Sequence, residues 1–227
     1  TTLESNYSWD FRTVAPYPWD IGSYTPTNTQ TNVALNQAIT VTFYTDIDSS
    51  TVTPTSFYVK DETGNYVGGT RAVAGKVVTF TPAGGYLGQN TSYTVVIPNK
   101  KIKYTTGVYV VSGQTWWFKT MPPIDGPIEI YPPSGEKDVG IDITIYAKFD
   151  QDLEPATCTK ENFKLFKGDL QIGGSVSYDA VEKKIKFQPG IRLESETLYR
   201  VVLSKDIRTT AGVSMVSDYE WEFRTAK

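Results

Sequence analysis

Histidine is absent from this sequence of 227 residues, and cysteine occurs only once, at Cys158. The chain therefore has no imidazole to activate a serine or thiol nucleophile, no histidine ligand for zinc and no pair of cysteines for an internal disulfide. It also has no apolar run near the roughly 18 residues that a membrane-spanning helix needs. These absences exclude the commonest nucleophilic and zinc chemistries, and we expect no membrane span in this segment.

A strong charge of one sign is also missing, since the formal net charge is only −3. There are 7 basic and 5 acidic residues between Ala15 and Thr120, against 14 basic and 18 acidic residues from Ile124 to Lys227. Neither half has the basic stripe that is typical of nucleic-acid-binding proteins. We therefore expect no nucleic-acid partner and two regions whose surfaces differ.

What the sequence does have is a short phrase that occurs three times. Its copies are Trp9-Asp-Phe11-Arg-Thr13, Trp116-Trp-Phe118-Lys-Thr120 and Trp221-Glu-Phe223-Arg-Thr225. The central phenylalanines are 118 − 11 = 107 and 223 − 118 = 105 residues apart, about the length of an immunoglobulin-type domain. The spacing predicts one domain over residues 15–120 and a second over 121–227, with residues 1–14 as the last strand of a preceding repeat.

Alternating apolar residues predict β-strands within each repeat. Ile39-x-Val41-x-Phe43 is matched 106 residues later by Ile145-x-Ala147-x-Phe149, and a period of two is typical of a strand with one buried face. Glycine and proline pairs separate such runs, and helical periodicity is not sustained. We predict an all-β fold with about seven strands per repeat, in two antiparallel sheets with Greek-key connections. Only short segments, such as 48–52 and 155–158, are expected to form a helical turn.

Proline-rich segments follow the first two copies of the phrase. They are Val14-Ala-Pro-Tyr-Pro18 and Met121-Pro-Pro-Ile-Asp-Gly-Pro127. Short linkers of this composition are semi-rigid. We therefore expect the domains to form an elongated rod.

Several motifs together resemble a known family. They include Tyr131-Pro-Pro-Ser-Gly-Glu-Lys-Asp-Val139, the strand pattern that begins at Ile145, and the closing Tyr219-x-Trp221-x-Phe223-Arg-Thr225. This combination resembles the bacterial Ig-like domain of S-layer type. The resemblance implies tandem Ig-like sandwiches in a modular surface protein, adhesin or secreted polysaccharide-degrading enzyme, and it implies no catalytic residues.

The preferred functional hypothesis is a non-catalytic structural spacer of an extracellular or cell-surface protein. Its partners would be neighbouring copies or other domains of the same protein. Residues 1–14, an orphan strand without its own sheet, could be donated to a neighbour's sheet. The alternative is a carbohydrate- or ligand-binding accessory module, with cell-wall or other polysaccharide as its partner. The candidates for strand donation are Leu3, Tyr7, Trp9 and Phe11, and those for a ligand site or interface are Tyr17, Trp19 and Trp117.

The remaining candidates have weaker sequence signals. Asp46, Asp48, Asp150 and Asp152 are weak candidates for calcium ligands, and their alternative role is to form turns by bonding their own backbone. We otherwise expect no cofactor. Asn6 and Asn90 lie in Asn-x-Ser triplets that match the glycosylation pattern. Cys158 aligns with Val52, and this favours a buried structural role.

Overall fold

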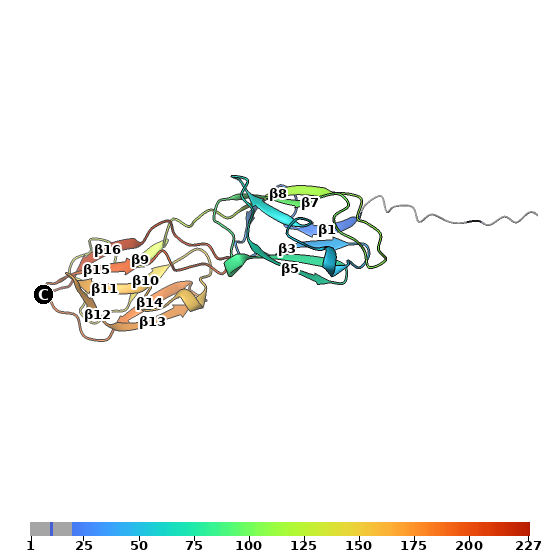
Figure 1. Ribbon diagram of the computed structural model, residues 1–227. Coiled ribbons are helices and arrows are strands. Elements are labelled where there is room, and N and C mark those ends of the chain that lie inside the picture. The colour runs from blue at the N-terminus through green and yellow to red at the C-terminus, as the bar shows by residue number, and fades with distance from the viewer. Residues whose placement is uncertain (1–9, 11–19) are drawn as a thin grey trace, which may run out of the picture.

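The computed structural model describes residue 10 and residues 20–227. Within this part of the chain, β-strands are joined by turns and three short 3₁₀-helices, and no α-helix is present. Figure 1 shows two β-sandwiches arranged end to end, with the strands β1–β8 in one and β9–β16 in the other. None of the helical turns in residues 20–227 has the length and apolarity of a membrane-spanning helix.

The first sandwich, domain 1, consists of two sheets of four strands. One sheet has the order β1-β3-β6-β5 and the other β2-β8-β7-β4. The bounds are β1 (Ile21–Thr25), β2 (Gln30–Val33), β3 (Ile39–Phe43), β4 (Tyr58–Asp61), β5 (Gly69–Ala74), β6 (Val77–Pro82), β7 (Ser92–Ile97) and β8 (Gln114–Thr120).

The second sandwich, domain 2, repeats this plan with sheets β9-β10-β14-β13 and β12-β11-β15-β16. The bounds are β9 (Glu129–Tyr131), β10 (Ile145–Lys148), β11 (Phe163–Lys167), β12 (Leu170–Ile172), β13 (Gly174–Asp179), β14 (Lys184–Pro189), β15 (Leu198–Leu203) and β16 (Tyr219–Arg224).

Two details differ from the sequence-based expectation. Each sandwich has eight named strands rather than about seven. The sheets are also not wholly antiparallel, because β2 pairs with β8 in parallel, and the Val139–Thr225 bridge is its parallel counterpart in domain 2. The physical reason is that the chain leaves β1 in one sheet and crosses to the other, where it meets the closing strand in the same direction.

The predicted helical turns are confirmed as 3₁₀-helices. The helix η1 (Ser49–Thr51) and the helix η3 (Pro155–Thr157) both lie in the segments that the sequence indicated. A third, η2 (Ala83–Gly85), follows β6. All three are short connections that leave the sandwiches unchanged.

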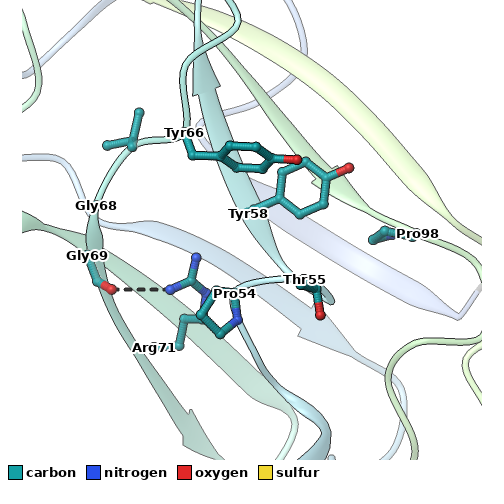
Figure 2. Close-up of a pocket in the computed structure, with 9 residues that line it drawn as sticks. Pro54, Thr55, Tyr58, Tyr66, Gly68, Gly69, Arg71 and Pro98 are labelled. Atoms are coloured by element: carbon teal, nitrogen blue, oxygen red, sulfur yellow. Dashed lines mark hydrogen bonds between the residues drawn. The ribbon is translucent and has the colours of Figure 1, made fainter.

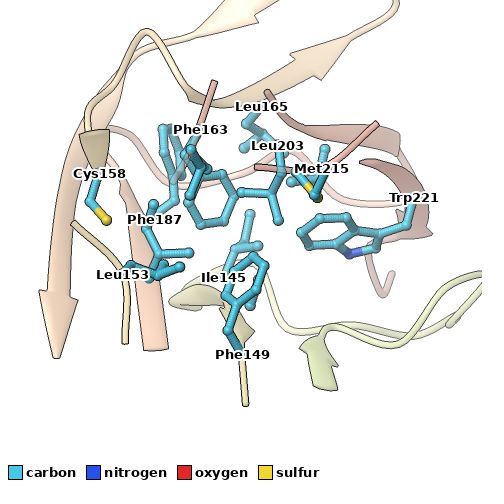
Figure 3. Close-up of a cluster of buried hydrophobic side chains, with 14 of the residues drawn as sticks. Ile145, Phe149, Leu153, Cys158, Phe163, Leu165, Phe187, Leu203, Met215 and Trp221 are labelled. Atoms are coloured by element: carbon cyan, nitrogen blue, oxygen red, sulfur yellow. The ribbon is translucent and has the colours of Figure 1, made fainter. Parts of the chain in front are cut away.

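The core of each sandwich lies between its two sheets. In β3, Ile39, Val41 and Phe43 are buried and alternate with half-buried residues, as the period of two predicts. In domain 2 the core extends from Cys158 to Trp221, which lie on opposite sides of the cluster in Figure 3. Burial raises the pKa of the Cys158 thiol to about 11, so this cysteine acts as a small apolar residue.

The repeated phrase closes each sandwich in the same way. In β8, the side chains of Trp116 and Phe118 enter the core, while the Thr120 hydroxyl donates to the Gly88 carbonyl at 2.6 Å. In domain 2, the Thr225 hydroxyl donates to the Glu194 carbonyl, also at 2.6 Å. The phrase thus provides two core residues and one threonine. The threonine hydroxyl bonds the loop that precedes the neighbouring strand, β7 in domain 1 and β15 in domain 2.

Candidate functional site

The joint between the sandwiches is the first candidate site. The loop between β15 and β16 reaches domain 1, where the Leu35 amide donates to the Ala211 carbonyl at 2.9 Å. The Asn36 side-chain amide donates to the Thr210 carbonyl at 3.1 Å. Two successive residues of domain 1 therefore bond two successive carbonyls of domain 2, and this pattern fixes the register of the joint.

Gln89 adds a reciprocal contact on the other side of the joint. The Ser214 amide donates to Gln89 Oε1 at 2.7 Å, and Gln89 Nε2 lies 3.4 Å from the Ser214 hydroxyl. The linker joins the same loop, because the Ile124 amide donates to the Ser214 carbonyl at 3.2 Å and Ile124 forms a parallel bridge with Met215. The linker is thus bonded to domain 2 rather than running free between the domains.

Apolar contacts fill the space between these hydrogen bonds. Leu35 belongs to domain 1 by sequence, yet its side chain is part of the buried cluster of domain 2, together with Val213 and Met215. A Cβ added to Gly212 would lie 2.5 Å from the Tyr86 ring and 3.3 Å from the Leu35 Cβ. The two domains are therefore in close contact at Gly212.

The second candidate site is a surface groove of about 670 Å³ on domain 1 (Figure 2). Its walls come from the segment before β4, from β4, from the connection between β4 and β5, from the start of β5 and from the residue after β7. The side chains that give it character are Pro54, Tyr58, Tyr66, Arg71 and Pro98.

Aromatic and cationic groups meet at this groove. Figure 2 shows the rings of Tyr58 and Tyr66 beside each other, and their centroids are 5.2 Å apart in an edge-to-face arrangement. The Lys60 ammonium lies 4.8 Å from the centroid of the Tyr66 ring. Arg71 donates to the Phe57 carbonyl at 2.6 Å and to the Gly69 carbonyl at 3.1 Å, and partial burial lowers its pKa. The groove thus offers exposed ring surface beside fixed positive charge.

The corresponding groove of domain 2 has different chemistry. Its volume is about 540 Å³, and its walls include Lys160, Glu161, Lys164 and Gln171. Lys164 occupies the place of Tyr58, so the paired tyrosines belong to domain 1 alone. Both domains therefore have a groove at this place, but its side chains differ in type.

Of the four aspartates that the sequence offered for calcium, Asp48 and Asp152 have side-chain contacts within the protein, and Asp46 and Asp150 accept hydrogen bonds at their main-chain carbonyls. Asp48 Oδ1 accepts from the Ser50 amide at 3.0 Å and from its hydroxyl at 2.7 Å, and these bonds lower the Asp48 pKa. Lys183 Nζ lies 3.7 Å from Asp152 Oδ1 and donates to the Asp150 carbonyl at 3.0 Å. The Asp46 carbonyl accepts from the Thr105 amide. Within residues 20–227 and residue 10, no three acidic, cysteine or histidine side chains are grouped as metal ligands would be.

The other sequence candidates are not gathered into one site. Trp117 is 42% exposed on β8 and does not line the groove of Figure 2. Asn90 is exposed, has a positive φ of 51° and donates its amide to the Met121 carbonyl. The candidates that lie outside the described residues are Leu3, Asn6, Tyr7, Trp9, Phe11, Tyr17 and Trp19.

Sequence reasoning missed the residues that make both sites. Because Phe57 and Val59 face the core, the alternation placed Tyr58 on the solvent face, and this signal was readable. Its pairing with Tyr66 depends on a hairpin, so no spacing rule indicated it. Nothing in the sequence showed that Leu35 enters the core of the next domain.

Comparison with known proteins finds a family model and several solved structures that match this chain. The model of the bacterial Ig-like domain matches residues 16–120 and again residues 128–225. CopC from Methylosinus trichosporium OB3b is 15% identical over 46% of this chain and 95% of that chain, with a TM-score of 0.36. No curated protein sequence matches this chain.

Two other solved structures match nearly the whole chain. The N-terminal part of the bacterial S-layer protein SbsC is 16% identical over 90% of this chain, with a TM-score of 0.36. The match covers 43% of that chain, so this chain spans less than half of it. The fibronectin(III)-like modules of Clostridium thermocellum CbhA are 9% identical over 91% of this chain and 93% of theirs, with a TM-score of 0.26.

Proposed function

Because this chain belongs to the bacterial Ig-like domain family, which matches both of its halves, we propose that it is a non-catalytic structural spacer of a modular surface protein. The family match confirms the predicted resemblance and, with the all-β sheets, the tandem Ig-like sandwich fold. The proposed localisation is the cell surface or the extracellular space. The spacer would hold the parts on either side of it at a set distance and orientation.

The packed joint is the observation that carries this proposal. Flexible linkers leave domains free to reorient, whereas this joint combines hydrogen bonds in register with a shared apolar cluster. A contact of this kind converts two small sandwiches into one stiff, elongated unit (Figure 1). Stiffness and length are the properties that a spacer requires.

Two glycines provide a matched test of the stiff joint. Gly212 and Gly107 have φ values of 82° and 85°, so alanine is equally strained at both positions. A Cβ at Gly212 would strike Tyr86, while a Cβ at Gly107 would meet nothing within 4 Å. We expect Gly212→Ala to loosen the joint and Gly107→Ala to leave it intact.

Small-angle X-ray scattering in solution can distinguish these outcomes. The unaltered chain and Gly107→Ala should each fit one extended shape, and Gly212→Ala should require a spread of interdomain angles. A broad spread of angles in the unaltered chain would contradict the spacer function. Identical, extended scattering from all three proteins would show that the close contact at Gly212 does not hold the joint.

The groove of Figure 2 favours a second function, the binding of a carbohydrate. Exposed rings beside cationic donors can stack on a sugar ring and bond its hydroxyl or acidic groups. We expect Tyr66→Ala to abolish binding to an acidic cell-wall polysaccharide in a calorimetric titration, with Trp117→Ala as the control. Equal binding by both variants, or no binding by the unaltered chain, would rule the groove out as the site.

A further inference from the structure

The loop of domain 2 that forms the joint has a counterpart on domain 1. The second loop, Ile207–Met215, has the sequence Ile-Arg-Thr-Thr-Ala-Gly-Val-Ser-Met. The first loop, Ile102–Val110, has the sequence Ile-Lys-Tyr-Thr-Thr-Gly-Val-Tyr-Val and connects β7 to β8. The two loops have the same residue at four positions: isoleucine (102 and 207), threonine (105 and 210), glycine (107 and 212) and valine (108 and 213). The first loop lies at the end of domain 1 that faces away from domain 2.

The two loops also share one backbone conformation. Lys103 and Tyr109 form the same antiparallel bridge as Arg208 and Ser214. Three backbone hydrogen bonds of 2.8 to 2.9 Å also correspond. In the first loop they run from the amides of Tyr104, Gly107 and Thr105 to the carbonyls of Val108, Tyr104 and Asp46. In the second loop they run from the amides of Thr209, Gly212 and Thr210 to the carbonyls of Val213, Thr209 and Asp152. The first loop therefore has the shape of a loop that is already seen in contact with a domain.

What differs is the burial of the apolar side chains. Val213 is 1% exposed and belongs to the buried cluster of domain 2, whereas its counterpart Val108 is 59% exposed. Tyr109 and Val111 beside it are 44% and 38% exposed. The contrast between the loops therefore lies at Val108, because Ser214 replaces Tyr109 and Val216, the counterpart of Val111, is itself 75% exposed.

A buried carboxylate holds the first loop in this shape. Asp20 is 2% exposed and accepts hydrogen bonds from the Tyr104 hydroxyl at 2.7 Å and from the amides of Val111 and Ser112 at 2.8 and 2.6 Å. The loop is therefore ordered before any partner arrives, and little conformational entropy is lost on docking.

We infer that the first loop is a docking surface for another domain of this family. The end of that domain that binds the loop would resemble the end of domain 1 that contacts domain 2. That end presents an aliphatic residue followed by asparagine, as Leu35 and Asn36 do, and a glutamine at the position of Gln89. In the joint, these groups donate to the carbonyls of Ala211 and Thr210 and bond Ser214. The inference rests on the proposed spacer function and names the partner of one end of the spacer.

The far end of domain 2 is a poorer fit, and this argues against a second copy of the chain as the partner. Ile141 replaces Leu35, but Asp142 replaces Asn36 and Ser195 replaces Gln89. A carboxylate cannot donate to the carbonyl of Thr105, and it would be repelled by that oxygen. The docking surface therefore selects an end that bears amide side chains.

The test duplicates residues 14–120, so that the protein has two copies of domain 1, each preceded by its linker. The copy nearer the N-terminus is called upstream, and the copy next to domain 2 is called downstream. In a Cys158→Val background, Val108→Cys is placed in either the downstream or the upstream copy, and labelling by a charged maleimide is followed by mass spectrometry. The downstream thiol should react at least about tenfold more slowly than the upstream thiol, because only the downstream loop has a domain end to bind. Asn36→Asp in the upstream copy should restore fast reaction downstream.

Three outcomes would overturn the inference. Equal reaction rates in the two copies would show that the loop does not dock. Protection that survives Asn36→Asp would show that the amide end is not what the loop recognises. In the chain of 227 residues, protection that grows with protein concentration would show that a second copy is the partner. If the scattering test succeeds and the labelling test fails, the spacer function remains and only the docking surface is lost.

Discussion

Two buried tryptophans at equivalent positions have different polar surroundings. The Trp116 Nε1 donates to the Pro26 carbonyl at 2.9 Å, whereas the Trp221 Nε1 has no hydrogen-bond partner among the described residues. Both rings lie in a core, with exposures of 1% and 3%. The pair therefore separates the contribution of a hydrogen bond from that of packing.

We expect Trp116→Phe to destabilise its domain more than Trp221→Phe does. Both substitutions remove similar apolar area, but only the first breaks a hydrogen bond, so its cost should be about 1 to 3 kcal/mol greater. Urea unfolding followed by circular dichroism measures this difference. Equal losses in the two variants would show that the bond to Pro26 contributes nothing net.

The second prediction at this scale concerns Asp20, which was only one of many carboxylates in the sequence. Asparagine can keep an oxygen on the amides of Val111 and Ser112 and turn its amide toward the Tyr104 oxygen, so Asp20→Asn should cost only about 1 to 2 kcal/mol. Asp20→Ala leaves two partly buried amides and the Tyr104 hydroxyl without this acceptor and should cost more, about 2 to 4 kcal/mol. Denaturant unfolding decides this prediction, and it is wrong if the two variants are equally stable.

At the scale of single elements, the short edge strand β9 is attached to the interior strand β10 by polar side chains. Tyr146 of β10 donates to Glu129 Oε1 of β9 at 2.6 Å and stacks on Tyr131 with the ring centroids 5.6 Å apart. The hydrogen bond that Tyr146 donates to Glu129, followed by burial, raises the pKa of Tyr146 to about 12, and the same bond lowers the pKa of Glu129.

This pair gives β9 a pH-dependent attachment. The raised tyrosine pKa contributes stability that is present below the usual value of 10.0 and is lost as the pH rises through about 12. The lowered carboxyl pKa contributes stability that is present above the usual value of 4.5 and is lost as the pH falls. We therefore expect Tyr146→Phe to destabilise domain 2 near neutral pH and to have little effect in acid. Unfolding at both pH values checks this, and a constant difference would contradict it.

Much of the element pattern was predictable, and the exceptions have physical reasons. Alternation located the strands around Ile39 and Ile145 because one face of each lies on a core. The glycine pairs before β5 and β13 were interpreted only as turns. However, Gly69 and Gly174 begin strands, and a Cβ on either would lie 2.6 Å from the ring of Phe80 or Phe187. Close approach of a distant ring is a tertiary contact, and local sequence does not encode it.

For the molecule as a whole, the joint makes domain 2 depend on a residue of domain 1. Leu35 is 3% exposed within the buried cluster of domain 2, and its counterpart Ile141 is only half-buried. The linker and the repeat predicted an elongated pair of domains, and the structure agrees. The sharing of Leu35 was beyond prediction because it depends on how the domains turn toward each other.

We expect Leu35→Ala to lower the stability of domain 2 by about 2 to 4 kcal/mol, as a buried truncation does, although the residue belongs to domain 1. The matched control Ile141→Ala lies within domain 2 and should cost less. Scanning calorimetry should show the transition of domain 2 moving to lower temperature and away from that of domain 1. A shift confined to the transition of domain 1 would mean that the two domains are not coupled through Leu35.

The parallel pairing of β2 and β8 has a consequence for how domain 1 bears a load. The two strands lie near opposite ends of the domain's chain and run in the same direction, so traction on those ends slides one strand along the other. Their links include the Thr29 amide to the Trp117 carbonyl at 2.7 Å and the Met121 amide to the Val33 carbonyl at 2.9 Å. In such shear, all of these bonds are strained together and must rupture at once. The crossover that broke the antiparallel pattern thus places these hydrogen bonds where they resist a pull on the two ends of domain 1 together.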